Sequence, residues 1–264
     1  MKKYYSAICL IIRDENEYLQ EWIRHHLKLG FDCIYIYDHN CKIPIEHTIR
    51  TKLKSYEREK IRIINWNGGH IHAQDEAYQD CLNNYRGEAE WIAFIDTDEF
   101  IVLHKDDSIN DFLKRYEDVG GIYMNWIMYN ANNQVKKKNE PVMKRFTQTC
   151  ADFQQYGKLI IKPDRVTKMY IHEAAYIPGF HTVDEDKNPV IGRRHPYHIN
   201  YIQCSHYYTK SWEEWKNKIS RGVADPYFGR NLREFFLYNP EMKYLDDGTE
   251  YYQVYERNVK REVL

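Results

Sequence analysis

Several features that would place this 264-residue chain in a familiar class are missing. Its six cysteines are scattered without a C-x-x-C pair, which argues against a zinc knuckle or a disulfide framework and for reduced thiols. Its 38 basic and 39 acidic side chains balance and no long basic run occurs, so we expect no nucleic-acid partner. No apolar run is long enough to cross a bilayer. We therefore expect a cytoplasmic protein without a transmembrane segment.

The short motifs of several enzyme classes are missing as well. No G-x-G-x-x-G follows the first apolar run and no G-x-x-x-x-G-K-[ST] occurs, which disfavours a usual dinucleotide fold and a P-loop. The H-E-x-x-H string of zinc hydrolases is absent, and His172-Glu173 has no second histidine at that spacing. A nucleotidyltransferase also uses paired aspartates and a metal, but it would need a glycine-rich phosphate loop that this sequence lacks.

What the sequence does have is an alternation of strand-like apolar runs and helical patterns, which indicates βαβ units and a mainly parallel sheet. The pattern predicts strands over 4–12, 33–37, 61–64, 91–95 and 121–126, and helices over 15–30, 44–56 and 73–85. We expect one α/β catalytic domain with two halves. Residues 1–126 would bind the nucleotide, and residues 127–264, with a closing helix from about Asp246, would bind the acceptor.

The most informative segment is 91–101, where an apolar strand runs into Asp96 and Asp98. Carboxylates two residues apart at the mouth of a buried strand can both face a divalent cation when the chain turns there. Their hard oxygens suit Mg²⁺ or Mn²⁺. A polar turn whose aspartate caps the next helix explains the same pattern.

Polar clusters also follow the first two predicted strands, at 13–17 and 38–40. In open α/β sheets, ligands bind outside the carboxyl ends of the strands. We therefore expect these two clusters to meet the 96–99 cluster in one crevice. A nucleotide held there by carboxylates and a metal is the binding mode that the missing phosphate loops leave open.

Three sequence blocks together carry a family resemblance. They are N-E-Y-L-Q-E-W-I at 16–23, D-x-D-E-F at 96–100, and H-Y-Y-T-K-S-W-E-E-W at 206–215 with Lys218, Arg221 and Gly222 after it. In order and spacing the chain resembles the family-92 glycosyltransferases and their bacterial relatives in the family-2-like superfamily. The last block is the most specific to the family, whereas residues 130–201 match only loosely.

The resemblance implies a metal-dependent inverting glycosyltransferase, a hexosyltransferase, with the nucleotide-diphospho-sugar transferase (GT-A type) fold. The donor would be a nucleotide-sugar, UDP-sugar favoured, and the acceptor a saccharide or lipid-linked saccharide in bacterial surface polysaccharide synthesis. The reaction would take place in the cytoplasm, and peripheral contact with the inner face of the membrane stays open. The alternative is a noncatalytic carbohydrate-binding protein that retains the fold. It would predict degraded metal carboxylates, yet Asp96, Asp98 and His206 are present.

The resemblance also implies roles for single residues. Asp98 would be the first metal ligand, His206 would complete the coordination of Mn²⁺ (or Mg²⁺), and Asp96 would reach the donor ribose or a metal-bound water. A core position is the alternative for His206. The other donor-binding candidates are Arg13, Asn16, Glu17, Asp38, Lys210, Lys218 and Arg221, of which the last three would clamp the phosphates.

Three of these candidates have a second reading. Asn16 could instead cap the first helix, and Asp38 could instead form a turn. Lys218 could lie on the solvated face of a helix. The sequence leaves both explanations open for each of them.

Inversion by direct displacement needs a base that takes the proton of the acceptor hydroxyl. We expect a carboxylate from the segment after the strand at 121–126. The candidates are Asp152, Glu173, Asp184, Glu185 and Asp186, and His172 and His181 lie near enough in sequence to orient one of them. Glu173 and Asp184 are the two catalytic candidates that we favour, with a surface position as the alternative for each.

Overall fold

The computed structural model describes residues 2–69, 71–150, 155–222 and 230–244. By their internal contacts, the residues form two units. The first contains Met1–Trp126 and Gln154–Ser205, and the second contains Ile127–Phe153 and His206–Leu264. The functional halves 1–126 and 127–264 stay a prediction, and in the structure Gln154–Ser205 groups with the first unit. In the described part of the chain, no helix is long and apolar enough to cross a membrane.

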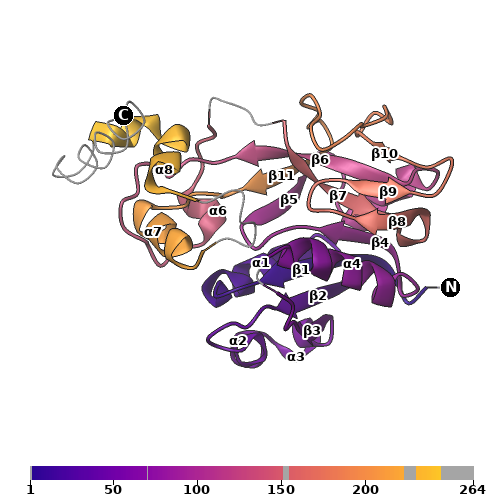
Figure 1. The fold of residues 1–264 in the computed structure, drawn as a ribbon, viewed down its shortest axis with the longest axis horizontal. Helices are drawn as coiled ribbons and strands as arrows, with labels where there is room; N and C mark the ends of the chain where they lie inside the picture. Colours follow the sequence, from indigo (N-terminus) through magenta and orange to yellow (C-terminus); the bar gives the residue numbers. More distant parts are fainter. Residues whose placement is uncertain (1, 70, 151–154, 223–229, 245–264) are drawn as a thin grey trace. The chain divides into compact units, whose positions relative to one another are not determined.

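The strands form a nine-stranded sheet in the order β3-β2-β1-β4-β7-β6-β11-β5, with β10 paired to β6, and a separate hairpin of β8 and β9 (Figure 1). Their bounds are β1 Tyr4–Ile12, β2 Cys33–Asp38, β3 Ile61–Asn65, β4 Ala89–Phe94, β5 Glu99–Leu103, β6 Gly121–Met128, β7 Gly157–Ile161, β8 Val166–Met169, β9 Ala174–Tyr176, β10 Thr182–Val183 and β11 Ile202–His206. Strands β1 to β4 are parallel, whereas β7 is antiparallel to β4 and β6. The predicted α/β class with a mainly parallel sheet is confirmed.

The helices of the described residues are α1 Asn16–Lys28, α2 Ile45–Lys52, α3 Ser55–Arg58, α4 Ala73–Tyr85, α5 Ile109–Leu113, α6 Val142–Arg145, α7 Trp212–Ser220 and α8 Leu232–Tyr238. The predicted helices over 15–30 and 73–85 are present as α1 and α4, the one over 44–56 is divided, and α5 to α8 were not predicted. The single helix predicted over 44–56 is two, because Leu53 is extended and interrupts it. Gly30 ends α1 with a φ of 105°, which side chains rarely adopt, as the predicted C-terminal cap requires. The predicted closing helix after Asp246 lies outside the described residues.

The core of the first unit fixes where the polar strand ends lie. Alternate side chains of β1 and β2 point to the same face of the sheet and pack there against the apolar side of α4. They are Ala7, Cys9, Cys33, Tyr35 and Tyr37 from the strands and Ala77, Tyr78, Cys81 and Leu82 from the helix. Because this packing sets the register, the carboxyl ends of β1, β2 and β3 come level, with Ile12 opposite Asp38 and Asp38 opposite Asn65.

The second unit has a core of its own, made mostly of aromatic side chains from α7 and α8. It contains Ala131, Trp212, Trp215, Phe235, Phe236 and Met242. All six cysteines of the chain are free thiols, in agreement with the sequence-based expectation.

Candidate functional site

The three polar clusters meet at the carboxyl edge of the parallel strands, as the sequence predicts. The backbone N–H of Lys42 donates to Asp14 Oδ1 over 2.8 Å, which joins the loop after β2 to the loop after β1. The Thr97 hydroxyl donates to the carboxylate of Glu15, which joins the turn after β4 to the same loop. One edge of the sheet therefore gathers the polar clusters 13–17, 38–40 and 96–99 of the first unit.

The turn between β4 and β5 is held in place by a buried tryptophan. Trp22 of α1 is fully buried, and its Nε1 donates to the carbonyl oxygens of Asp96 and Glu99 over 3.0 and 2.8 Å. The Glu99 carboxylate in turn accepts the backbone N–H of Asp96 over 2.9 Å. These bonds fix the backbone around Asp98, whose side chain is only 5% exposed.

Asp96 has partners on both carboxylate oxygens. Its Oδ1 accepts from the Gln74 amide and, over 3.1 Å, from the Tyr78 hydroxyl, while Lys158 Nζ lies 3.1 Å from Oδ2. A carboxylate oxygen has about two acceptor positions, so Oδ1 is filled and Oδ2 keeps one. This arrangement suits the predicted role of Asp96, which is to accept from one more hydroxyl or water rather than to be the first metal ligand.

Lys158 is a site residue that the sequence reasoning missed. It lies on β7, is fully buried, and places Nζ 3.9 Å from Glu99 Oε2 as well as beside Asp96. Burial lowers the pKa of Lys158, but the carboxylates of Asp96 and Glu99 outweigh it and raise this pKa above its usual value. The signal in the sequence is a lysine inside the apolar strand G-K-L-I-I, where a charge needs a partner.

Glu99 is the second residue that was missed, and it shows that negative charge is in excess here. Burial raises the pKa of the Glu99 carboxyl well above its usual range, Asp96 and Asp98 raise it further, and Lys158 opposes them. Three carboxyl groups thus surround one ammonium group, and because burial favours the protonated form of Glu99, the formal charge is that of two aspartates against one lysine. A hard divalent cation on oxygen ligands would balance that charge, so the donor set fits Mn²⁺ or Mg²⁺, with Asp98 as the residue that would hold it.

Asp38 makes the turn that its alternative explanation expected, whereas the helix cap suggested for Asn16 is wrong. Both oxygens of Asp38 accept backbone N–H groups, from Cys41 over 3.1 Å and from Ile45 over 2.9 Å, so Asp38 forms the turn into α2. The Asn16 amide donates to the Ile43 carbonyl and the Thr48 hydroxyl, both over 2.9 Å, and tethers α1 to α2 instead of capping α1. Donor binding by these two residues stays a prediction.

The remaining donor candidates of the first unit are two charged residues beside Asn16. Arg13 follows β1 and Glu17 lies in the first turn of α1, and both side chains are exposed. They lie at the carboxyl edge that the prediction requires. Their binding role stays a prediction as well.

The predicted residues near the C-terminus belong to the second unit. His206 ends β11 and is buried, with its ring centroid 5.4 Å from that of Tyr208. Lys218 is 5% exposed and donates to the Tyr208 carbonyl over 2.7 Å, so the reading of a solvated helix face is wrong. Lys210 is buried and has a φ of 53°, which is uncommon for a residue with a side chain. Arg221 caps the C-terminal end of α7.

Asp98 and His206 thus come from different units, and their pairing at one metal stays a prediction from the sequence. Part of the family-specific block has a plain structural purpose. Ser211 and Glu214 form a capping box at the start of α7, in which each side chain bonds the backbone N–H of the other residue. The sequence signal for this capping box is S-x-x-E at 211–214.

The two favoured base candidates have opposite surroundings. Glu173 is exposed in the turn between β8 and β9. Asp184 is 1% exposed, and although burial raises its pKa, hydrogen bonds from Asn188, His195 and the Asp186 backbone outweigh it and lower the pKa below its usual value. A carboxylate with a lowered pKa is the weaker base. Asp152 lies outside the described residues.

A hollow of about 560 Å³ lies beside α4 in the first unit. Its lining is mixed in character, with aromatic rings, amides and carboxylates, and it comes from the loop after β3, from α4 and from the end of β8 and the turn that follows. The lining residues are Trp66, His72, Asp75, Glu76, Gln79, Asp80, Asn83, Lys168, Met169 and Tyr170. Aromatic faces with nearby hydrogen-bonding groups are a surface on which sugars bind.

The sequence profile named Glycosyltransferase family 92 matches residues 3–232. Similar curated proteins include the family 92 protein Os08g0121900 of Oryza sativa subsp. japonica, 25% identical over 226 residues that cover 84% of this chain and 36% of the relative. The Ricinus communis protein RCOM_0530710 is 25% identical over 229 residues, 84% of this chain and 39% of the relative. The chain thus spans little more than a third of the length of these relatives.

Solved structures with similarity to the chain include two sugar transferases. One is glucosyl-3-phosphoglycerate synthase from Mycobacterium tuberculosis with Mn²⁺, UDP and glucosyl-3-phosphoglycerate, at a TM-score of 0.35 and 11% identity over 62% of this chain and 58% of that one. The other is mannosyl-3-phosphoglycerate synthase from Rubrobacter xylanophilus, at 0.38 and 12% over 62% and 55%. Both TM-scores lie below 0.5, so the family assignment rests on the sequence match.

Proposed function

Because this chain belongs to glycosyltransferase family 92, we propose that it transfers a sugar from a nucleotide-diphosphate donor, UDP-sugar favoured, to a saccharide acceptor. One observation carries the proposal. A chain that matches the family over residues 3–232 also folds so that Asp96 and Asp98 lie on a rigid turn at the carboxyl edge of the parallel strands. That edge is where ligands bind in open α/β sheets.

The proposed reaction needs a group that stabilises the departing nucleoside diphosphate. A divalent cation supplies this as a Lewis acid when it is bound, and Asp98, with His206 as the second proposed ligand, would hold it. The chain's own contribution is orientation. Lys158, Gln74 and Tyr78 hold the Asp96 carboxylate, which we propose accepts a hydrogen bond from the donor ribose or from a metal-bound water. Lys210, Lys218 and Arg221 are the proposed phosphate contacts.

We propose Glu173 as the base for an inverting displacement, ahead of Asp184. The support is its exposure and its place in the turn that also carries Tyr170, a lining residue of the hollow beside α4. The lowered pKa of Asp184 argues against its taking a proton from a hydroxyl. The acceptor saccharide would then lie in that hollow, with Tyr170 as a stacking platform.

The cellular setting is part of the proposal. Six free thiols suit a reducing compartment, so we propose that the reaction takes place in the cytoplasm. Surface polysaccharide synthesis on a lipid-linked acceptor at the inner face of the membrane is the context that we favour.

The proposal is tested by nucleotide release from a panel of UDP- and GDP-sugars, each with and without Mn²⁺ and a mixture of saccharide acceptors. We expect one donor class to be consumed, only with metal, by the wild type and by Asp107→Asn, an exposed carboxylate near the site in sequence. Asp98→Asn should lose the activity. If no donor is consumed while the protein still binds saccharides, the noncatalytic carbohydrate-binding alternative would replace the proposal.

A further inference from the structure

A second cluster of metal-ligating side chains lies in the first unit, outside the turn after β4. Asp184, His195 and His198 come from the irregular segment between β10 and β11, and one ligand atom of each lies within 4.8 Å of the others. His195 Nε2 is 3.1 Å from Asp184 Oδ2, and His198 Nδ1 is 3.7 Å from the same oxygen. Two imidazole nitrogens thus converge on one carboxylate oxygen.

The carboxylate of Asp184 is oriented before any ligand arrives. Its Oδ1 accepts the backbone N–H groups of Asp186 and Asn188 over 2.9 and 2.8 Å, and the Asn188 amide donates to Oδ2 over 3.1 Å. The side chain is 2% exposed. Outer hydrogen bonds of this kind are what fixes a ligating carboxylate in metal sites.

One buried side chain sets the spacing of the two histidines. Asn125 of β6 is 1% exposed, and its amide donates to the His195 carbonyl over 3.0 Å while its oxygen accepts the His198 N–H over 3.2 Å. Both histidine backbones are therefore tied to the same point of the sheet. The cluster is a built arrangement within a segment that otherwise has little regular structure.

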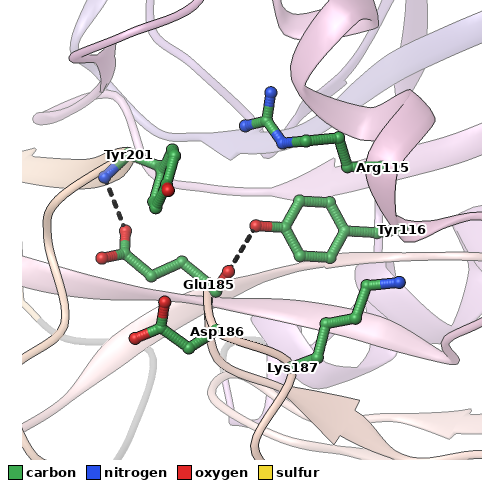
Figure 2. Close-up of a pocket in the computed structure, with 6 residues that line it drawn as sticks. All are labelled: Arg115, Tyr116, Glu185, Asp186, Lys187 and Tyr201. Atoms are coloured by element: carbon green, nitrogen blue, oxygen red, sulfur yellow. Dashed lines mark hydrogen bonds between the residues drawn. The ribbon is translucent and has the colours of Figure 1, made fainter.

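A competing set, Glu185, Asp186 and His198, is weaker because Glu185 is already used. Its carboxylate accepts the backbone N–H groups of Asn200, Tyr201 and Ile202. Figure 2 shows the Glu185 carboxylate turned toward the backbone N–H of Tyr201. The backbone carbonyl of Glu185 faces the Tyr116 hydroxyl. Asp186 differs, because its half-exposed carboxylate lies 3.0 Å from His198 Nδ1 and can supply a fourth ligand.

We propose that Asp184 Oδ2, His195 Nε2 and His198 Nδ1 bind one Zn²⁺, with Asp186 or a water molecule at the fourth position. Two imidazoles and a carboxylate suit zinc in tetrahedral coordination. The all-oxygen carboxylates of the turn after β4 suit a harder cation instead. The ion would cross-link the segment between β10 and β11, so it would stabilise the fold without entering the transfer reaction.

The test is the zinc content and zinc affinity of tag-free, full-length protein that has been stripped with a chelator and then titrated with Zn²⁺ alone. We expect one high-affinity ion per chain in the wild type, with a rise in unfolding temperature. His181→Ala, an exposed histidine just before β10, is the matched control and should keep both. His195→Ala and His198→Ala should lose both. Asn188→Ala, which removes the amide that donates to Asp184 Oδ2 and keeps the two backbone bonds to Oδ1, should weaken zinc binding up to about 10-fold.

Two further measurements separate the zinc site from the proposed transferase activity and from folding defects in the variants. Asp98→Asn should bind zinc like the wild type, even if it is inactive as a transferase. Co²⁺ substituted into the unaltered protein should give the strong visible absorption of four-coordinate cobalt with imidazole ligands. No zinc in the wild type, or equal zinc in wild type, His195→Ala and His198→Ala, would overturn the site.

Discussion

Each unit of the molecule has a buried cation that pairs with carboxylates, and the two arrangements differ in charge balance. In the second unit, Arg145 and Glu214 are 1% and 3% exposed and meet through two hydrogen bonds of 2.9 and 2.7 Å, one cation for one anion. In the first unit, Lys158 faces Asp96 and Glu99 with Asp98 close by in the same turn. In the balanced pair each charge has a partner, and the pair holds α7 against α6. The unbalanced cluster carries surplus negative charge, which supports the proposal that it binds a cation.

The largest effect should come from removing the proposed metal ligand of the unbalanced cluster. Asp98→Asn keeps the shape of the side chain and removes its charge, so we expect a loss of about 4 kcal/mol of transition-state stabilisation, roughly a thousandfold in kcat/KM. Donor turnover with Mn²⁺ measures it. Glu214→Gln, which alters the balanced pair, should fold less stably but keep its rate per folded molecule. Equal losses of kcat/KM in Asp98→Asn and Glu214→Gln would contradict a functional difference between the two regions.

Removing the cation of each pair gives the next largest effect. Arg145→Met leaves the buried Glu214 carboxylate without its partner, which should cost about 3–5 kcal/mol of unfolding free energy. Lys158→Met should cost less, because Asp96 is partly exposed and the Glu99 carboxyl can stay protonated. Chemical denaturation with and without Mn²⁺ then separates the two regions. Mn²⁺ should restore part of the loss in Lys158→Met, where it can take the lysine's place, and none of it in Arg145→Met. Restoration of both variants to the same extent would contradict a specific site.

The pH dependence of the unfolding free energy gives a further difference between the two regions. Burial raises the folded-state pKa of Glu99, so the folded chain binds a proton that the unfolded chain releases above its own pKa of about 4.3. Wild-type stability should therefore fall as pH rises from about 4.3 toward the folded pKa. Glu99→Gln lacks this loss, and denaturation at a series of pH values should find it more stable than wild type near neutrality and similar near pH 4. A Glu99→Gln protein that is less stable at every pH would show that the charge is already compensated.

The smallest effect concerns aromatic side chains. Those of the second unit, such as Trp212 and Phe235, are buried in its core, whereas Tyr170 lines the open hollow beside α4. Tyr170→Ala should remove a stacking face worth about 1 kcal/mol and raise the acceptor KM roughly fivefold, with stability little changed. Tyr56→Ala, at a 61% exposed tyrosine outside the hollow, is the matched control. An unchanged KM would move the acceptor elsewhere.

Periodicity was enough to predict most of the strands and helices of residues 1–126. The bounds of β1 and α4 match the prediction residue for residue, because their apolar side chains repeat with the period of a strand and of a helix. The division between α2 and α3 was missed because Leu53 fits the helical pattern while its backbone is extended. Strand β5 was missed because its few residues follow the D-x-D turn directly and were taken as part of the same run.

The sequence indicated those residues of the candidate site whose pattern is formed by neighbours in the chain. Asp96 and Asp98 stand out because two aspartates follow a buried strand, but Lys158 and Glu99 matter only through partners that the fold brings to them. Asp38 shows the opposite limit, since a carboxylate that ends a strand looks the same in sequence whether it bonds a ligand or, as here, the backbone of the next turn.

Calorimetric titration of UDP and GDP into the protein shows whether the unbalanced carboxylate turn binds a metal and a nucleotide together. We expect binding of one nucleotide with Mn²⁺, little without it, and none with metal in Asp98→Asn, while Asp107→Asn behaves as wild type. Binding of a nucleotide that is equally strong without metal, or unchanged in Asp98→Asn, would contradict this joint binding.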